Sequence, residues 1–297
     1  MNGVICINKP KGFTSFDVIA KLRGILKMKR IGHSGTLDPM ATGVLPVFLG
    51  NATRACDMLF DNSKTYLAGF KLGCTTDTQD SSGTVLTSSE IMVSKDEFIE
   101  VMHGFIGEIQ QIPPMFSAVS INGKRLYELA RKGIEIEREA RSVHIEKLEL
   151  QEFDNQSMVG KLLIECSKGT YVRTIIHDIG QKLGSGGIMT ELVRLSSNGF
   201  TLDEALTLDE VKSLFDKDGL KDFILPVEKV FEELPKLYLD EVQTRLYKNG
   251  VKLDLSRVNG ITKSNNYAVY SYDKQFIGTA IADFDKVILK VEKNFFI

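Results

Sequence analysis

A short polar loop near the N-terminus carries residue types that are suited to chemistry. Residues 32–43 read GHSGTLDPMATG, and an apolar run at 44–50 follows directly. Glycines let the backbone approach a ligand closely, and Pro39 disfavours a helical conformation at Asp38. Asp38 is therefore placed as a reactive carboxylate beside a wall of apolar residues. On these residues alone, an Asx turn before a strand is the alternative.

Two residues elsewhere in the chain could complete such a site. Arg173 is predicted in the first turn of a helix at 172–183, where a cation interacts unfavourably with the helix dipole. This position suggests an anionic partner, either Asp38 or a structural acid. Tyr66 lies near the start of an alternating strand at 64–73, where core packing is the other interpretation. A carboxylate, an arginine and an aromatic ring together suit chemistry at an electrophilic carbon, such as a sugar anomeric carbon or an activated pyrimidine.

Other reactive motifs are missing from the sequence. It contains no P-loop and no GxGxxG motif, and no Ser-His-Asp set can be assembled from it. The four cysteines are dispersed, which predicts reduced core residues of a cytosolic protein. The segment 73–83 contains Asp77 and Asp80, but a hard-cation loop needs more oxygen ligands at ordered spacing. We interpret it as a structural turn and expect neither a metal nor a cofactor.

Composition and charge narrow the class of protein. The chain has 297 residues, of which 43% are hydrophobic and 26% charged, as expected for one large globular domain or two. No apolar run has transmembrane length and no N-terminal signal is recognisable, so we expect a cytoplasmic protein. The net charge of -2 argues against a general polyanion binder, but the charge is uneven: +5 over 1–38, +3 over 113–133 and -6 over 202–240. This distribution allows a phosphate-bearing partner at a defined place.

Apolar spacing predicts the elements that must position these residues. In the larger part of the chain the predicted strands are at 4–7, 44–50, 64–73, 143–153, 158–167 and 188–195. The predicted helices there are at 16–26, near 52–60, and at 95–103, 124–132 (a short helix after an Asn122-Gly123 turn), 172–183 and 202–214. A separate C-terminal unit is predicted to have a helix at 240–248 and strands at 267–272, 276–281 and 287–291. His177 is expected at the surface. The basic segment 113–133, with Phe116 and Tyr127 interleaved, is either a projecting nucleic-acid contact or an ordinary surface segment.

Taken together, the sequence resembles the bacterial TruB family of tRNA pseudouridine synthases. The matching segments, in order and spacing, are residues 3–15 (GVICINKPKGFTS), 32–49, 64–83, 113–133 and 168–195. The motif GHSGTLDPMATGVLP is highly specific, and the resemblance covers most of the first 230 residues. It implies an α+β fold whose catalytic domain, residues 1–233, has a mixed and mainly antiparallel central sheet flanked by helices and loops. It also implies a thumb-like insertion at about 105–142 and a small β-rich, PUA-like RNA-contacting domain at 234–297.

The resemblance implies an isomerase (an intramolecular transferase) that converts uridine 55 in the T-loop of tRNA to pseudouridine without a cofactor. Asp38 would be the nucleophile on a flipped-out uridine and would attack either the ribose or uracil C6, and base flipping costs roughly a few kcal/mol. A guanidinium, which does not lose its proton, would keep this buried carboxylate ionised. The carried-over roles are Arg173 pairing with Asp38, Tyr66 stacking on the uracil and assisting C5 deprotonation, His33 filling the vacated place in the T-loop, Tyr171 lining the pocket, and Leu192 contacting the base. Lys9, Lys124 and Arg125 are expected as further substrate contacts, the T-arm stem-loop as the partner, and a monomer as the oligomeric state.

Two departures from the family pattern accompany this match. Gly187-Ile188 stands where the family usually has Ala-His, and Val193-Arg194-Leu195 where it often has two arginines. These differences predict that a phosphate or loop contact is missing from this edge. Three alternative functions remain at this point: a non-catalytic tRNA-binding or tRNA-folding module, a relative that acts within a guide-RNA complex, and a phosphohydrolase or nucleosidase that uses Asp38. The guide-RNA class would carry longer basic extensions, which this sequence lacks.

Overall fold

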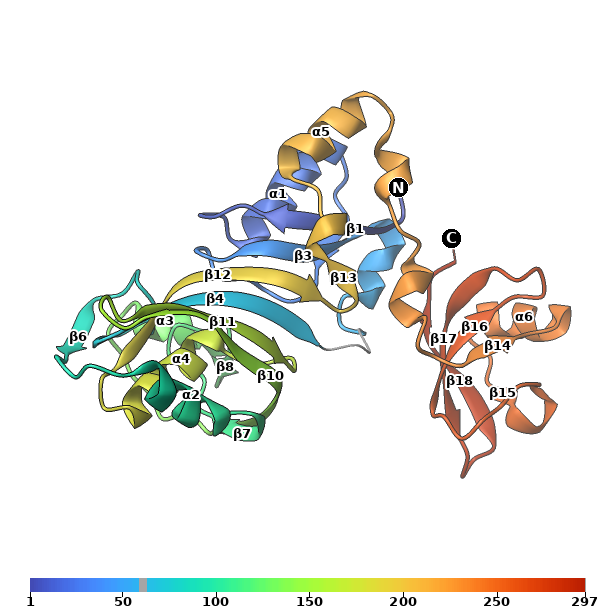
Figure 1. Cartoon of the computed structure of the whole chain (residues 1–297). Coiled ribbons are helices and arrows are strands. Elements are labelled where there is room, and N and C mark those ends of the chain that lie inside the picture. The colour runs from blue at the N-terminus through green and yellow to red at the C-terminus, as the bar shows by residue number, and fades with distance from the viewer. Residues whose placement is uncertain (59–62, 297) are drawn as a thin grey trace.

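The predicted strands of the larger part of the chain assemble into one nine-stranded sheet (Figure 1). The structure is a computed structural model that describes residues 1–58 and 63–296. The strands of this sheet are β1 (Gly3–Lys9), β2 (Ile31–His33), β3 (Thr42–Leu49), β4 (Lys64–Leu72), β7 (Gly107–Gln111), β10 (Arg141–Asp154), β11 (Val159–Cys166), β12 (Gly187–Ser197) and β13 (Phe200–Thr201). Their order is β1-β3-β12-β4-β11-β10-β7, with β2 paired to β3 and β13 to β12. Every pair is antiparallel except β3 and β12, so the expected mixed, mainly antiparallel sheet is confirmed.

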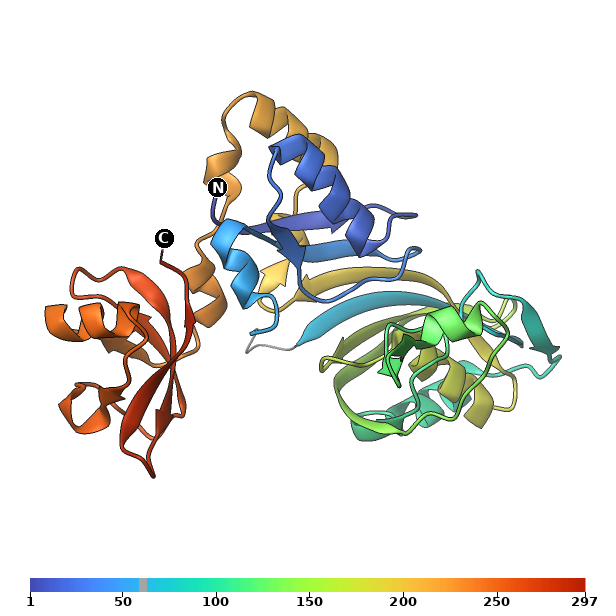
Figure 2. The ribbon, with the colours of Figure 1, turned by 180° about the vertical axis from the view of Figure 1, so that it is seen from behind.

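Helices cover the two ends of this sheet. The α-helices are α1 (Ser15–Leu26), α2 (Lys95–His103), α3 (Leu126–Ala130), α4 (Val172–Lys182), α5 (Leu208–Asp216) and α6 (Glu241–Lys248). The 3-10 helices are η1 (Gly50–Ala55), η2 (Leu202–Glu204), η3 (Leu220–Phe223), η4 (Val227–Phe231) and η5 (Leu255–Arg257). α1 and α5 pack over β1 and β3, whereas α2 and α4 lie against β10 and β12 at the other end (Figures 1 and 2).

Local sequence explains where the main helices begin. The Thr14 side chain accepts a hydrogen bond from the backbone N–H of Asp17, and the Asp17 carboxylate accepts one from the backbone N–H of Thr14. The same reciprocal capping box begins α2, α5 and α6. Each box satisfies two backbone donors that the first helical turn leaves open. The starts of these helices are therefore encoded locally, and the cap at Thr14 was predicted from the sequence.

Aromatic stacking fixes α2 on the sheet. The rings of Phe70 on β4 and Phe98 on α2 are stacked with centroids 4.7 Å apart, and Phe153 on β10 lies 5.4 Å from Phe98. Phe70 and Phe98 are buried in the core cluster that also contains the inner face of α4. Buried aromatic pairs contribute packing energy beyond their buried area. This core gives α4, which carries Arg173, a rigid base.

The central strand β12 joins the two halves of the sheet. It pairs in parallel with β3, where Arg194 lies opposite Gly43, and antiparallel with β4, where Arg194 lies opposite Tyr66. Gly43 has a φ of +100°, and a Cβ there would lie 2.2 Å from the Arg194 carbonyl oxygen. Only glycine fits this crossing of backbones.

Several predicted elements differ from the structure. The helix expected at 202–214 is broken into η2 and α5, because the backbone of Leu206 extends along β1 and bonds to Cys6 and Asn8, each over 2.9 Å. The helix expected near 52–60 is the shorter η1, and residues 59 and 60 lie outside the described residues.

Two short hairpins account for the other differences. The helix expected at 124–132 is reduced to α3, because Lys124–Arg125 forms β9, which pairs with β8 (Ser120–Ile121). The Asn122-Gly123 turn between them was predicted, and both of its residues have positive φ. The polar segment at 73–83 includes β5 (Cys74–Thr76), which pairs with β6 (Val85–Ser88).

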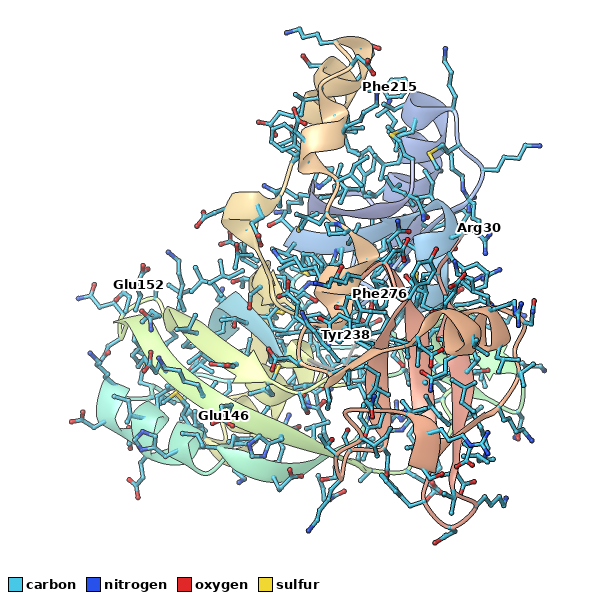
Figure 3. All side chains as sticks on the ribbon, turned by 90° about the vertical axis from the view of Figure 1, so that its right-hand side faces the viewer. Arg30, Glu146, Glu152, Phe215, Tyr238 and Phe276 are labelled. Carbon is cyan, nitrogen blue, oxygen red and sulfur yellow. The ribbon has the colours of Figure 1, made fainter. Side chains whose placement is uncertain are left out.

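The C-terminal residues form a second, β-rich unit (Figure 3). Its strands are β14 (Lys236–Tyr238), β15 (Leu253–Asp254), β16 (Asn266–Tyr270), β17 (Phe276–Asp283) and β18 (Ile288–Asn294), in the order β14-β16-β17-β18-β15. Phe276 packs with Phe231 and Phe295 where this unit meets the larger body. The β-rich C-terminal part of the expected fold class is confirmed. Among the described helices, none has the length and apolarity needed to cross a membrane.

We predict that Gly43→Ala lowers the free energy of unfolding by about 3 kcal/mol, because it combines a left-handed φ with a backbone clash. Gly12→Ala is the matched control, since Gly12 has a φ of +86° but nothing within 4 Å of a Cβ. It should cost about 1 kcal/mol. Urea unfolding followed by circular dichroism measures both, and equal losses would contradict the close approach of β3 and β12.

Candidate active site

The loop between β2 and β3 presents Asp38 and is held from below by the N-terminal segment. The backbone N–H of Leu37 donates to the Ser15 hydroxyl over 2.9 Å, and the N–H of Gly12 donates to the Pro39 carbonyl over 2.8 Å. These bonds anchor the chain on both sides of Asp38. The carboxylate therefore has a fixed position relative to α1 and β1.

Lys9 lies beneath this loop and is fully buried. Its ammonium donates to the carbonyl oxygens of Phe13, Pro10 and Pro39. Burial lowers the pKa of Lys9 to about 8, while the Asp38 carboxylate opposes that shift. In this structure three protein carbonyls surround the Lys9 ammonium, so Lys9 anchors the loop; that it also contacts the substrate stays a prediction.

Asp38 and Arg173 form a bidentate ion pair. Arg173 Nε lies 3.0 Å from one carboxylate oxygen and Nη2 lies 3.2 Å from the other. The Arg173 side chain is 5% exposed and that of Asp38 is 36% exposed, so the arginine forms the buried side of the pair and the carboxylate faces outward. Two parallel N–H···O bonds fix orientation as well as distance.

Two backbone carbonyls hold the other side of the guanidinium. Arg173 Nη1 donates to the carbonyl of Thr78 and Nη2 to that of Phe116, each over 2.9 Å. Nη1 also lies 3.5 Å from the carboxylate of Asp80, which is buried. Segment 73–83 therefore contributes to the site and is not only the structural turn that we expected. Nothing in the local sequence marks Asp80 for this role, because its partner lies 93 residues away.

Burial and the nearby cations shift the pKa of Asp38 in opposite directions. Burial raises the pKa of Asp38, Arg173 lowers it, the Asp80 carboxylate raises it and Lys9 lowers it, with a net upward result. A buried carboxylate loses solvation in its charged form, and a nearby cation restores part of that loss. Arg173 is the main group that keeps Asp38 ionised.

Asp38 opens into a cavity of about 360 Å³, with a narrower extension of about 100 Å³. Asp38, Tyr66, Tyr171 and Arg173 line both spaces, and Leu192 lines the narrower one. The backbone of Tyr171 is fixed because its N–H and C=O both bond to the side chain of Gln111. A carboxylate at the junction of a cavity and a narrower recess can act on a planar group inserted into that recess.

Arg194 supports the pocket from beneath and was not predicted as a site residue. It is fully buried, and its Nε donates to the Val44 carbonyl over 2.7 Å and its Nη2 to the Gly35 carbonyl over 2.9 Å. These two bonds hold the loop that carries Asp38, whereas the predicted loss of an RNA contact at this edge stays a prediction. Gly187, the other departure, lets α4 approach β12, because a Cβ there would lie 2.8 Å from the Ile176 carbonyl.

The remaining predicted residues lie around the pocket at different depths. His33 on β2 is half-buried, and burial, together with Arg194, lowers its pKa. Lys124 and Arg125 are exposed on the β8–β9 hairpin, and Arg125 donates to the carbonyl of Ala118, which lines the cavity mouth. The hairpin is therefore attached to the rim of the pocket.

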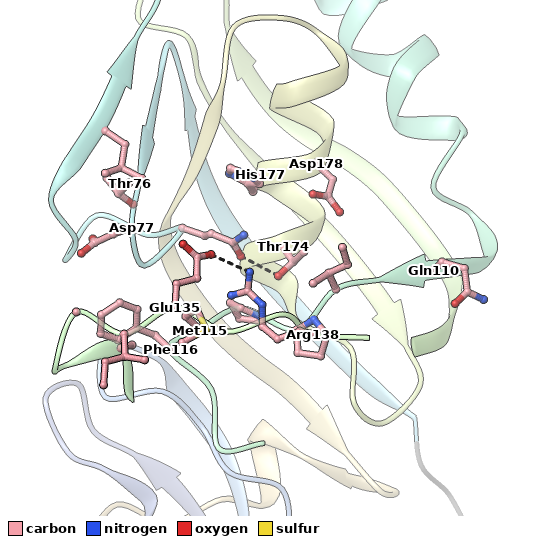
Figure 4. A pocket seen from close by; sticks show the side chains of 18 residues that line it. Thr76, Asp77, Gln110, Met115, Phe116, Glu135, Arg138, Thr174, His177 and Asp178 are labelled. Carbon is pink, nitrogen blue, oxygen red and sulfur yellow. Dashed lines mark hydrogen bonds and ion pairs between the residues drawn. The ribbon is translucent and has the colours of Figure 1, made fainter. Parts of the chain in front are cut away.

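A second cavity of about 670 Å³ lies between residues 112–138, the β5–β6 region and α4 (Figure 4). His177 and Asp178 on α4 face it, opposite Glu135 and Arg138. His177, which was predicted to be a surface residue, is half-buried and lines this space. Across the described part of the chain, no group of three or more His, Cys, Asp or Glu side chains could hold a metal ion.

Comparison with known proteins gives consistent matches. The model of the TruB family pseudouridylate synthase N-terminal domain matches residues 23–172, and that of the tRNA pseudouridylate synthase B C-terminal domain matches residues 173–232. The tRNA pseudouridine synthase B of Clostridium tetani is 43% identical over 280 residues, 94% of each chain. That of Clostridium kluyveri is 40% identical over 293 residues, 98% of this chain and 99% of its own.

Solved structures agree over almost the whole chain. A chain of a Cbf5-Nop10-Gar1 complex has a TM-score of 0.76 and 29% identity, covering 99% of this chain and 85% of its own. A chain of an H/ACA RNP bound to a substrate RNA containing 2'-deoxyuridine has a TM-score of 0.74 and 27% identity, with the same coverages. The fold is therefore shared across both parts of this chain.

We predict that Arg173→Gln moves the pKa of Asp38 to a higher value, because it removes the main cation that stabilises the carboxylate. Carbon-13 NMR of labelled aspartate carboxyls, assigned with Asp38→Asn, measures this titration. Arg138→Gln is the control, since Arg138 pairs with Glu135 in the second cavity. An unchanged or lower pKa in Arg173→Gln would contradict the electrostatic role of Arg173.

Proposed function

Because the chain belongs to the TruB family of pseudouridylate synthases, which convert uridine to pseudouridine in tRNA, we propose that it acts on uridine 55 of the T-loop with Asp38 as the nucleophile. The observation that carries this proposal is the bidentate contact of Asp38 with Arg173 at the base of a cavity. The paired carboxylate is fixed in orientation and has one side open to a ligand. That is the arrangement that a carboxylate nucleophile requires.

The isomerisation exchanges one bond of the base for another. Attack by Asp38 on either ribose C1′ or uracil C6 leads to breakage of the C1′–N1 bond. The freed uracil turns, C1′ bonds to C5, the C5 proton leaves and N1 gains a proton. Asp38 is then released unchanged. Atoms and electrons balance within the substrate and this carboxylate, so no oxidant or reductant is consumed.

The pocket residues divide between holding the base and moving its proton. Tyr66 stacks on the uracil, and its phenolate oxygen accepts the C5 proton. Tyr171 borders the ring and Leu192 contacts it from the recess, in line with their places around the cavity. His33 fills the space that the extruded base leaves in the T-loop. Extrusion costs roughly a few kcal/mol, which the buried, aromatic-lined recess offsets.

Recognition of the T-arm belongs to the rim of the pocket and the C-terminal unit. Lys124 and Arg125 project beside the cavity mouth, within a segment of net charge +3 at 113–133. We assign residues 1–233 to catalysis, about 105–142 to a thumb that closes on the T-arm, and 234–297 to a PUA-like RNA-contacting domain. The change from the nine-stranded to the five-stranded sheet at β14 supports this division. The protein would act in the cytoplasm as a monomer.

We predict that the protein releases tritium from a T-arm stem-loop labelled at C5 of uridine 55, and that Asp38→Asn lowers the rate at least about 10⁴-fold. Asn retains the shape of Asp but lacks the charge for attack. Binding of the RNA, measured by filter retention, should change less than about threefold.

The same assay separates the alternatives. A stem-loop labelled at another uridine is the control for position. Tritium release by Asp38→Asn at the wild-type rate would contradict the role of Asp38 as the nucleophile. Free uracil as the product would indicate a nucleosidase. Binding without release by the wild-type protein would indicate a tRNA-folding module.

We predict that Lys124→Ala/Arg125→Ala weakens T-arm binding by about tenfold at moderate salt and reduces the slope of log affinity against log salt by about 2, because two phosphate contacts are lost. Lys212→Ala/Lys217→Ala, two exposed lysines in the acidic segment, is the matched control. Equal effects of the two double variants would exclude a specific contact at the β8–β9 hairpin.

A further inference from the structure

Arg194 is a buried cation whose position resembles that of a site residue more than that of a structural one. Its side chain comes from β12, the strand that joins the two halves of the sheet, and lies fully buried under the loop that carries Asp38. Among the described residues, no carboxylate forms an ion pair with it. A buried, unpaired arginine is costly, so a stable protein retains one only where its donors are used.

Two of the three donor nitrogens of Arg194 are accounted for. Nε bonds to the carbonyl of Val44, on the strand after the loop, and Nη2 to the carbonyl of Gly35, at the start of the loop. Nη1 makes no fully aligned hydrogen bond with any residue that the structure describes. A Cβ on Gly35 would lie 3.2 Å from Nη1, and Gly35 lines the catalytic cavity. Nη1 therefore lies directly behind the cavity wall.

The strand register brings Tyr66 to the same place. Arg194 and Tyr66 are directly opposite each other in the antiparallel pair of β12 and β4. Opposed residues in such a pair project from the same face of the sheet, with their Cβ atoms about 5 Å apart. Tyr66 is buried and lines both catalytic spaces. The register therefore places Arg194, with its unoccupied donor, beside Tyr66 at the floor of the pocket.

We propose that Arg194 is a positioning residue for Tyr66, whose hydroxyl oxygen it holds and whose deprotonated form it favours. This inference rests on the proposed function, in which Tyr66 accepts the C5 proton of uracil. A guanidinium has only donors, so the Tyr66 oxygen must accept from it, and Tyr66 also lines the cavity that would receive the base. The phenolate oxygen gains the C5 proton while the electron pair of the C–H bond restores the C5–C6 double bond, and the phenol later loses this proton to water.

The groups that surround the Tyr66 phenol shift its pKa in opposite directions. Burial raises the pKa of Tyr66, and Arg194 on β12 lowers it through its charge and as a hydrogen-bond donor. Cys166 on β11 and Asp38 in the loop raise it. Arg194 is thus the one group among these that favours the phenolate, as a cation beside a developing anion should.

A double-mutant cycle tests the coupling of Arg194 to Tyr66. Single-turnover tritium release is measured for the wild-type protein, Arg194→Lys, Tyr66→Phe and the double variant, with RNA affinity measured for each. Arg194→Lys retains the positive charge but loses the planar guanidinium with its several N–H donors. It should slow tritium release by about 10- to 100-fold while RNA affinity changes less than about twofold. In the Tyr66→Phe background the same substitution should slow release by less than about threefold, because its target is absent.

Ser15→Ala is the matched control, because Ser15 anchors the same loop through Leu37 and acts on it from α1. Its effect should be the same in the wild-type and Tyr66→Phe backgrounds. If Arg194→Lys slowed tritium release as much in the Tyr66→Phe background as in the wild-type protein, the proposal would be overturned and Arg194 would be only a loop anchor. A wild-type rate for Arg194→Lys would overturn it as well.

A second readout does not depend on activity. The same four proteins, together with Ser15→Ala and Ser15→Ala/Tyr66→Phe, are compared by equilibrium unfolding in urea. Arg194 and Tyr66 should show a coupling in stability that Ser15 and Tyr66 lack. Additive losses of stability would contradict a direct contact. If the wild-type protein released no tritium, the proposed function would fail, but this unfolding cycle would still test the contact.

Discussion

The site depends on keeping one carboxylate charged where its surroundings disfavour charge. Asp38 is desolvated by its pocket, and the buried guanidinium of Arg173 is what compensates. Arg173 in turn needs partners for its remaining donors, which the carbonyls of Thr78 and Phe116 and the carboxylate of Asp80 supply. Removing one partner from such a buried pair leaves an uncompensated charge and is strongly destabilising. Three segments far apart in the sequence therefore converge on one guanidinium, and a change in any of them can disturb the ion pair with Asp38.

The nine-stranded sheet makes this convergence possible. β12 runs parallel to β3 and antiparallel to β4, so it connects the half that carries the Asp38 loop to the half that carries Tyr66 and α4. The glycine at the crossing, Gly43, lets the two backbones meet closely enough for Arg194 to reach under the loop. The close approach of β3 and β12 thus joins the two halves of the sheet and also places Arg194 behind the pocket.

Much of this arrangement could be predicted from local sequence. The capping boxes, the alternating strands and the Asn122-Gly123 turn encode their elements directly, and the glycine-rich loop together with the unfavourably placed Arg173 indicated an ion pair. What escaped prediction depends on burial and distant contacts. Lys9 was expected as a substrate contact and Arg194 was not singled out, because lysine and arginine are almost never fully buried. Each is held by carbonyls from distant segments. The break at Leu206 likewise arises from pairing with β1, about 200 residues earlier.

That pairing has a consequence for biosynthesis. The edge strand β1 exchanges backbone hydrogen bonds with Leu225 through Val4, and α1 shares its apolar core with α5. The first fifty residues therefore leave the ribosome well before the segments that cover them. At about 5–20 residues per second, translation of the intervening chain takes roughly ten to thirty seconds. During that interval the apolar strand β3 lacks its partner β12, and the loop that carries Asp38 gains its partners Arg173 and Arg194 only after those residues have been synthesised.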